Sequence, residues 1–358
     1  MADDTVREIR INPIVPSESV LVATARGMRP RKKEEVVARD TREHVETCPF
    51  CKGNEDKTPS TIAAFPNEKE WRVRIVENLF PILGDDSEEA AINFGLQQAI
   101  NGYGRHEVII DHAQHGISVY EMSEEHLQML FGAYRQRMSE LYESDSRLKY
   151  VLVFKNFGPA AGASIPHTHS QIIAMPVVPE NVINEVEHSR AYFRKHNQCV
   201  FCSLIDEALT YEATIYDRES GEVRRKINVG QYVVERGERF VAIKPFASRY
   251  EWEVHIMPLV HQSDFTKVTH EDLQDLANVV KRTMKRLEKV IGGAQYNFFL
   301  HSIPRAEEYS DCHDSYHWHL EICPRTSIPT GFELGSGLFV STISPEDAAK
   351  QLREVEID

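Results

Sequence analysis

Two histidines one residue apart, His167 and His169, stand in the segment SIPHTHSQIIAMP at residues 164–176. Imidazole binds metal ions, attacks electrophiles or lies hydrogen-bonded in a core, so residue type alone leaves three roles open. On a strand, residues two apart face the same side at about 7 Å, so a metal can hold one ring while the other faces a substrate. The same spacing also lets both rings hold one metal ion. Gln171 falls on this face, where its amide can donate to a phosphate oxygen.

Four of the six cysteines form two Cys-x-x-Cys pairs. In a reducing compartment such pairs are more often metal ligands or redox groups than structural disulfides. Structural zinc takes four thiolate and imidazole ligands, so histidines at strand ends are the natural completing ligands. The sequence predicts two zinc sites, formed by Cys48, Cys51, His115 and His167, and by Cys199, Cys202, His261 and His317. A disulfide or redox pair is the alternative for each couple.

The chain repeats its motifs at a distance of about 150 residues. His261 follows His115 by 146 residues, and the second His-x-His motif follows the first by 150. Each half carries Cys-x-x-Cys, a histidine at a strand end, a helix and then His-x-His. This repeat is too long for a solenoid unit and predicts a duplicated α+β domain. We expect one half at residues 1–185, with His-x-His-x-Gln and the first metal site, and another at 186–358, with the second.

Regular apolar patterns indicate the elements that position these residues. They predict strands at residues 71–76, 106–111, 149–155 and 170–176 in the first half. In the second half they predict strands at residues 232–235, 240–244, 252–257, 296–301 and 316–322. Helices are expected from Glu124, with Ser123 as N-cap, and from His270. A further helical segment at residues 180–198 is expected at the boundary between the halves.

A loop of small residues precedes the first His-x-His motif and contains Asn156, Gly158, Gly162 and Ser164. Small residues let the backbone approach a phosphate closely. Glycines alone would favour a tight connection without a ligand. Their position directly before His-x-His-x-Gln favours a phosphate-binding loop instead.

The net charge of −14 limits the classes of partner. Such a balance repels nucleic-acid backbones and anionic membranes. We find no apolar run near 18 residues and no signal peptide, so we expect a cytoplasmic protein that binds neither nucleic acid nor membrane. One basic cluster, at residues 25–33, suits either a single phosphate-bearing ligand or a solvated surface.

Several segments together resemble the galactose-1-phosphate uridylyltransferase family of the histidine-triad superfamily. The likeness covers nearly the whole chain and includes CPFC, ENLFP at residues 77–81, NFGPAAGASIPHTHSQ and GFELGSG. The resemblance implies two histidine-triad-like halves with antiparallel sheets and flanking helices, paired into a homodimer. It also implies an active site in the first half, where His167 binds zinc and His169 is the nucleophile.

The activity that the resemblance implies is nucleotidyl transfer in galactose metabolism. UMP would pass between a nucleoside diphosphate sugar and a hexose 1-phosphate through a nucleotide bound covalently to His169. Gln171 and Ser164 would stabilise charge on the phosphate. By the same resemblance, the nucleotide end of the pocket is formed by Arg26, Arg29, Asn78 and Phe80.

Some residues depart from the family pattern and keep alternatives open. Thr168 stands where the family often has proline, and Gly331 falls close to a lysine that some members place near the sugar phosphate. A related branch transfers adenylyl groups from ADP-glucose to phosphate, so a nucleoside diphosphate sugar phosphorylase or hydrolase is one alternative. A zinc-stabilised nucleotide-binding protein without turnover is another. Some members hold iron in the second half, through positions that correspond to Glu185, His301, His317 and His319.

Overall fold

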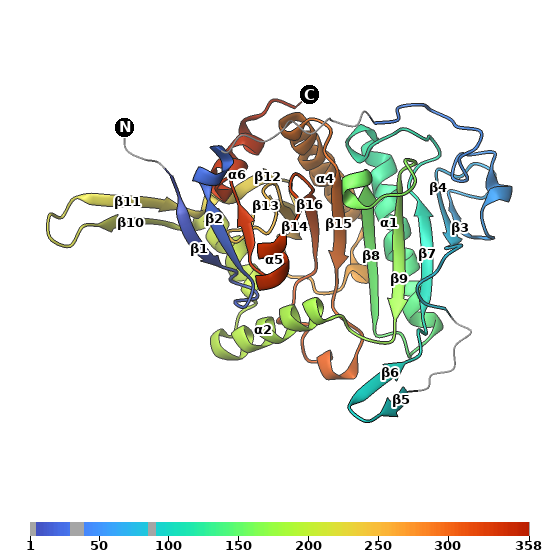
Figure 1. Ribbon diagram of the computed structural model, residues 1–358, viewed down its shortest axis with the longest axis horizontal. Coiled ribbons are helices and arrows are strands. Elements are labelled where there is room, and N and C mark those ends of the chain that lie inside the picture. The colour runs from blue at the N-terminus through green and yellow to red at the C-terminus, as the bar shows by residue number, and fades with distance from the viewer. Residues whose placement is uncertain (1–4, 29–38, 85–90, 358) are drawn as a thin grey trace.

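A computed structural model describes residues 5–28, 39–84 and 91–357. A ten-stranded sheet, antiparallel throughout, forms its centre (Figure 1). In spatial order the strands are β12 (Val233–Arg236), β13 (Phe240–Ile243), β14 (Val254–Pro258), β16 (His319–Pro324), β15 (Tyr296–His301), β8 (Tyr150–Phe157), β9 (His169–Met175), β7 (Arg105–Ile110), β4 (Val73–Glu77) and β3 (Thr61–Phe65). Five strands therefore come from each repeat, and the repeats meet where β8 pairs with β15.

Two long helices cover one face of this sheet, α1 (Glu124–Ser144) and α4 (His270–Ile291). The Ser123 hydroxyl accepts a hydrogen bond from the His126 amide, which caps α1. Thr269 and Asp272 form a reciprocal capping box at the start of α4. The apolar sides of both helices pack with inward-facing strand residues such as Ile109 and Ile256 in one continuous core.

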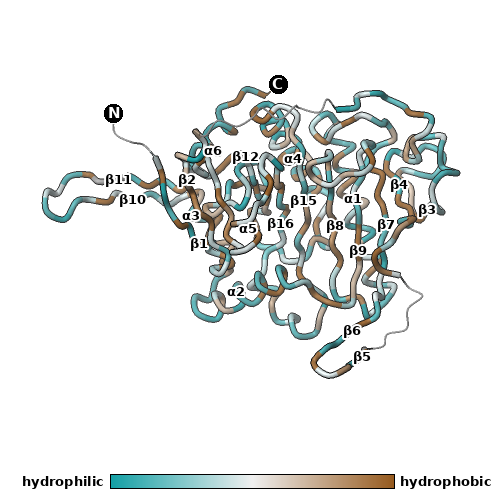
Figure 2. The backbone as a smooth tube through the Cα atoms, viewed as in Figure 1, coloured by the Kyte–Doolittle hydropathy of each residue, from teal (hydrophilic) through white to brown (hydrophobic). Residues whose placement is uncertain are grey.

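The opposite face is covered separately in each repeat. In the second repeat, α2 (Glu180–His196) and α3 (Val200–Thr210) pack on strand residues such as Val241 and Met257. In the first, the loop with Cys48, Phe50 and Cys51 packs on β4 and β7. Figure 2 shows the apolar residues concentrated along the central strands. Each cysteine pair therefore lies against the same face of the sheet.

Smaller elements surround the central sheet. A three-stranded sheet contains β1 (Arg7–Ile11), β2 (Ser19–Ala23) and β17 (Phe339–Ser341). Two hairpins project outward, β5 (Ala91–Phe94) with β6 (Gln97–Ile100), and β10 (Glu212–Tyr216) with β11 (Val223–Asn228) (Figure 1). The 3-10 helix η1 (Thr24–Met28) follows β2, and the chain ends with α5 (Gly331–Ser336) and α6 (Pro345–Glu354).

The α+β class and the antiparallel sheet are confirmed, and the expected strands and helices lie within a few residues of their predicted positions. The division into domains at residue 185 stays a prediction, since α2 runs across that position and the sheet continues from one repeat to the other. Among the residues with described positions, no helix combines the length and apolar character needed to cross a membrane.

Candidate active site and metal centres

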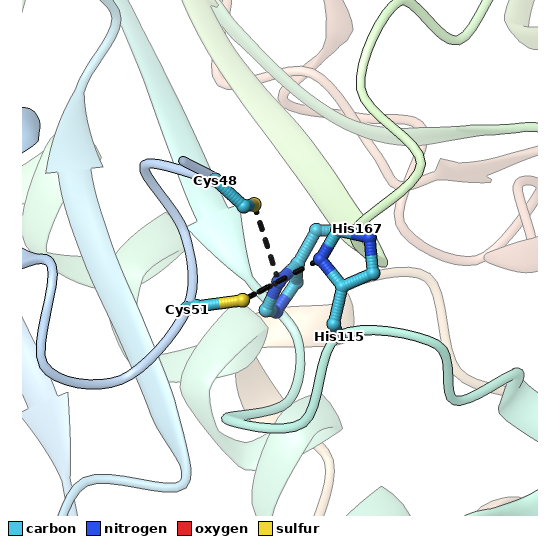
Figure 3. A group of neighbouring side chains, drawn as sticks. All are labelled: Cys48, Cys51, His115 and His167. Atoms are coloured by element: carbon cyan, nitrogen blue, oxygen red, sulfur yellow. Dashed lines mark hydrogen bonds between the residues drawn. The ribbon is translucent and has the colours of Figure 1, made fainter. Parts of the chain in front are cut away.

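Cys48, Cys51, His115 and His167 come together as a buried cluster (Figure 3). The Cys51 sulfur lies 3.4 Å from Nδ1 of His115 and 3.5 Å from Nδ1 of His167. The Cys48 sulfur lies 3.7 Å from the same His167 nitrogen. Tetrahedral zinc with bonds of about 2.3 Å to sulfur and 2.0–2.1 Å to nitrogen requires sulfur–nitrogen separations of about 3.6 Å. The cluster therefore fits a four-coordinate ion of this kind.

The surroundings of these side chains also favour a cation. Nε2 of His167 donates to the carbonyl oxygen of His112 at 2.7 Å, so Nδ1 keeps a lone pair that faces the sulfurs. Burial raises the pKa of the Cys48 thiol to about 11 and lowers the pKa of the His167 imidazole to about 4. Two thiolates in such a place need a compensating cation, which a divalent metal ion supplies.

The second repeat assembles the matching cluster, Cys199, Cys202, His261 and His317. The Cys202 sulfur lies 3.3 Å from Nδ1 of His261 and 3.5 Å from Nδ1 of His317. The Nε2 atoms of these histidines donate to the carbonyl oxygens of His313 and Pro258, as His167 does to His112. Both sets of four residues that the sequence predicted as metal ligands thus lie together.

A third buried cluster contains Glu185, His301, His319 and Glu321, whose donor atoms lie within 4.8 Å of one another. His317 lies instead with the cysteines, so the glutamate and three histidines noted from the sequence do not form one group. Nδ1 of His301 lies 3.0 Å from Glu185, and although burial lowers the pKa of His301, the Glu185 carboxylate raises it above the usual value. Arg249 contacts Glu321 at 2.6 Å, so ion pairs compensate charge within this cluster.

His169 begins β9 next to the cluster of Cys48, Cys51, His115 and His167, and it is 8% exposed. Its Nδ1 lies 2.8 Å from the carbonyl oxygen of His167, to which it donates when the proton is on that nitrogen. In that tautomer Nε2 carries the lone pair and is the nucleophilic atom. Burial and the nearby Lys155 ammonium lower the pKa of His169, so the ring is neutral at physiological pH.

Gln171 is held by His106, a residue that the sequence interpretation missed. Nδ1 of His106 accepts from the backbone amide of Ile82 at 3.2 Å, so Nε2 carries the proton and donates to Oε1 of Gln171 at 2.8 Å. The NH₂ group of Gln171 is therefore the end that His106 does not bind. The alternation of side chains along strands could have indicated His106. This residue lies on the predicted strand at 106–111, which pairs with the His-x-His strand, and its side chain is on the same face as Gln171.

The loop before His167 has the backbone conformation that its glycines permit. Gly158 and Gly162 both have φ of 85°, a region that other residues rarely adopt. A Cβ atom at Gly158 would also lie 2.5 Å from Gln295. Asn297 donates at 2.8 Å both to the Asn156 side chain and to the Ala161 carbonyl, so β15 anchors this loop. Ser164 is exposed in the same connection.

The residues expected at the nucleotide end fall into two groups. The Asn78 amide nitrogen lies 3.1 Å from Nε2 of His106, and Phe80, two residues later, is 82% exposed. The Asn78 side chain therefore lies on the Gln171 side of the site, and its Oδ1 accepts a hydrogen bond from the Phe80 backbone amide at 2.9 Å. Arg26 lies on η1, where it lines a cavity with Glu333 of α5. Arg29 lies outside the described residues.

Comparison with known proteins agrees with this geometry. Residues 1–179 match the family described as galactose-1-phosphate uridyl transferase, N-terminal domain. The ADP-glucose phosphorylase of Arabidopsis thaliana is 30% identical over 98% of this chain and 93% of its own. A galactose-1-phosphate uridylyltransferase of Thermotoga maritima is 26% identical over 98% of this chain and 99% of its own.

A solved structure has the same fold over nearly the full length. The crystal structure of an ADP-glucose phosphorylase from Arabidopsis thaliana with bound ADP-glucose aligns with a TM-score of 0.80 at 28% identity, covering 98% of this chain and 100% of that one. The family match and the full-length relatives agree with the motifs around His167 and His169. The chain therefore belongs to the galactose-1-phosphate uridyl transferase family and is an enzyme of the nucleotidyltransferase class.

Proposed function

We propose that this protein transfers a nucleoside monophosphate from a nucleoside diphosphate sugar to an acceptor phosphate through a covalent adduct on His169. The hydrogen bond between Nδ1 of His169 and the His167 carbonyl carries this proposal. It fixes the imidazole ring and leaves Nε2 as the attacking atom. The neighbouring metal cluster holds His167, so the nucleophile is attached to a rigid part of the strand.

The reaction consists of two displacements at one phosphorus atom. Nε2 of His169 attacks the α-phosphorus, the bond from phosphorus to the bridging oxygen breaks, and the sugar 1-phosphate leaves with that electron pair. An oxygen of the acceptor phosphate then attacks the same phosphorus and breaks the phosphorus–nitrogen bond. Because each leaving group is a phosphate or an imidazole, neither step needs a strong general acid.

The protein stabilises charge on the phosphate oxygens during both steps. The NH₂ group of Gln171 is suited to donate to one of them, since His106 holds the other end of the amide. Ser164 and the loop with Gly158 and Gly162 supply further donors at the start of the same strand. The second repeat has Glu321 two residues after His319, where the first has Gln171 after His169, so only the first repeat suits a phosphate.

We propose zinc at both cysteine–histidine clusters, because thiolate and imidazole ligands in this geometry favour it. Four protein ligands leave no open position, so the ion would stabilise the fold and supply no chemistry to substrate. In the third cluster the ion pairs Arg249–Glu321 and His301–Glu185 compensate the charge of the two carboxylates, so we propose no metal ion there.

The proposed donor and acceptor are UDP-glucose and a hexose 1-phosphate. Similarity to uridylyltransferases over 98% of the chain supports this choice. A second candidate is phosphorolysis of ADP-glucose. It is supported by the 30% identical ADP-glucose phosphorylase. It is also supported by Gly331, because a glycine stands here close to the position where some family members have a lysine near the sugar phosphate. Both candidates share the adduct on His169 and differ in base and acceptor.

We also propose a homodimer. Leu79, Phe80 and Ile82 are 65–82% exposed beside the site, and a second subunit would remove this apolar surface from water. Light scattering during size-exclusion chromatography should give twice the chain mass of 41.0 kDa. A monomer at micromolar concentration would contradict this proposal.

Labelled nucleotides test the proposed reaction. The protein is incubated with UDP-glucose or ADP-glucose labelled at the α-phosphorus, denatured, and assayed for bound label. A phosphorus–nitrogen bond should be labile in acid and stable in base. Release of label from isolated adduct by galactose 1-phosphate indicates uridylyl transfer, and release by inorganic phosphate indicates phosphorolysis. Absence of label from denatured protein with every donor would reject covalent transfer.

A further inference from the structure

A buried polar network lies behind the strand that carries His169. Lys155 and Asp111 are both 0% exposed, and their side chains meet at 2.5 Å. Nζ of Lys155 also donates to Oγ1 of Thr168 at 2.7 Å and to the carbonyl oxygen of His169 at 3.0 Å. Ser170 donates to Asp111 at 3.0 Å. Three consecutive residues, centred on His169, are therefore tied to one ion pair.

The lysine takes the place of a missing backbone partner. The ladder between β8 and β9 runs from Tyr150–Met175 to Phe154–Gln171 and stops before His169. The Thr168 carbonyl accepts from the Asp111 amide on the β7 side, so the next carbonyl, that of His169, points toward β8. The Lys155 ammonium accordingly satisfies a carbonyl that the neighbouring strand leaves unpaired.

The second repeat has no ion pair at the matching described positions, although its ladders have the same design. β8 pairs Phe154 with Gln171, and β15 pairs Phe299 with Glu321, so Leu300 stands at the position of Lys155. β7 pairs Ile109 with Ser170, and β14 pairs Ile256 with Leu320, so Pro258 stands at the position of Asp111. Trp318 and Leu320 replace Thr168 and Ser170, and both are buried.

This internal comparison separates folding from function. The fold accepts apolar residues at all four positions, as the second repeat demonstrates. A buried ion pair has a large desolvation cost and is often no more stabilising than apolar residues of similar volume. The polar network is therefore not needed for the sheet, and it occurs in the repeat that carries the nucleophile.

We propose that Lys155 and Asp111 are positioning residues that hold the backbone of residues 168–170 so that Nε2 of His169 faces the α-phosphorus. This inference rests on the proposed function, because it concerns the nucleophile of that reaction. The pair lies on the helix-covered face of the sheet, whereas the His169 ring is on the other. It therefore acts through the backbone and does not touch substrate.

The double variant Lys155→Met/Asp111→Asn tests this role. It removes both charges together, so no unpaired charge remains buried. Zinc content and melting temperature should stay close to wild type. The KM for the sugar nucleotide should change by less than about twofold, whereas the single-turnover rate of adduct formation should fall by roughly tenfold or more, as expected for a misplaced nucleophile. Leu300→Met, at the matching position of the second repeat, should leave this rate unchanged.

Thr168 supplies a second test that does not depend on the double variant folding. Thr168→Val preserves shape but removes the hydroxyl that Lys155 contacts, whereas Thr168→Ser keeps it. Adduct formation should be slower in the valine variant and near normal in the serine variant. Equal rates in these two variants, or wild-type rates in a folded double variant, would overturn the positioning role. Absence of any adduct on the wild-type protein would overturn the proposed function and this inference together.

Discussion

Nδ1 of His169 lies 2.8 Å from the carbonyl oxygen of His167, whose own Nδ1 faces the sulfurs of Cys48 and Cys51. One imidazole thus belongs to the cysteine–histidine cluster, and the other is oriented by the backbone of the first. The two rings are neighbours in sequence but have different surroundings, which fits the separate roles that we propose for them. This separation should be visible in variants, because one ring can be removed without the other.

His169→Gly should abolish the covalent adduct while metal binding by His167 is kept. We expect transfer to fall by about 10³-fold or more, because the nucleophile is lost and no other group replaces it. Added imidazole should restore part of the turnover, since the vacated space matches the missing ring. The matched control is His319→Gly in the second repeat, which should still form adduct on His169. Near-normal transfer by His169→Gly without imidazole would contradict covalent catalysis.

Elemental analysis should find two zinc ions per chain, one for each cysteine–histidine cluster. Cys48→Ser/Cys51→Ser should retain only the ion of the second repeat and should unfold at a lower temperature, because the proposed first ion would link residues 48–51 to His115 and His167. Cys199→Ser/Cys202→Ser should retain only the ion of the first repeat. If either double variant kept the full zinc content, the assignment of that site would be wrong.

Gln171→Glu should slow adduct formation by roughly 10²-fold, the scale for losing one donor to a developing negative charge. The change preserves the length of the side chain but places a carboxylate where we propose that an amide faces phosphate, and the second repeat already has a glutamate at this position. Glu321→Gln serves as the matched control and should leave the rate unchanged. Rapid-quench single-turnover assays measure the rates of adduct formation in both variants. Similar rates for Gln171→Glu and wild type would exclude a phosphate contact.

Local patterns allowed much of the central sheet to be predicted. The helix at 270–291 has an apolar stripe and a capping box within its first turn, and both signals are contained in neighbouring residues. Parallel pairing of β17 with β2 joins residues more than 300 positions apart, and no local pattern specifies such a pair. The three-stranded sheet was therefore missed, as were β3 and the two outer hairpins.

The internal repeat of about 150 residues allowed the predicted metal ligands to be assigned to two sets of four, because each ligand of one set has a counterpart in the other. Asp111 and Lys155 correspond to Pro258 and Leu300 of the second repeat, and His106 corresponds to Glu253, so repetition gave no signal for these three residues. Lys155 was nevertheless detectable in principle, since it follows Val151 and Val153 on the buried side of an alternating strand. The site residues that depend on contacts between distant strands are those that the sequence alone could not place.

His112 should make the protein sensitive to acid. Burial, together with His126 at a ring-centroid distance of 4.3 Å, lowers the pKa of His112 to about 3, whereas the unfolded chain has an ordinary value near 6.5. Between these values the unfolded state binds the additional proton, so the free energy of unfolding should fall as pH decreases, by up to about 1.4 kcal/mol per pH unit. Above about pH 8, where the unfolded imidazole is also neutral, this contribution should not change with pH.

His112→Asn isolates this effect. Nδ1 of His112 accepts from the Gln114 amide at 2.9 Å, and an asparagine oxygen can accept the same bond without titrating. Urea unfolding at pH 7 and pH 5 should show a smaller loss in the variant than in wild type, by up to about 2 kcal/mol. Protonation of the metal ligands lowers stability in both proteins and therefore cancels in this comparison. Parallel losses in the two proteins would mean that His112 does not titrate on unfolding.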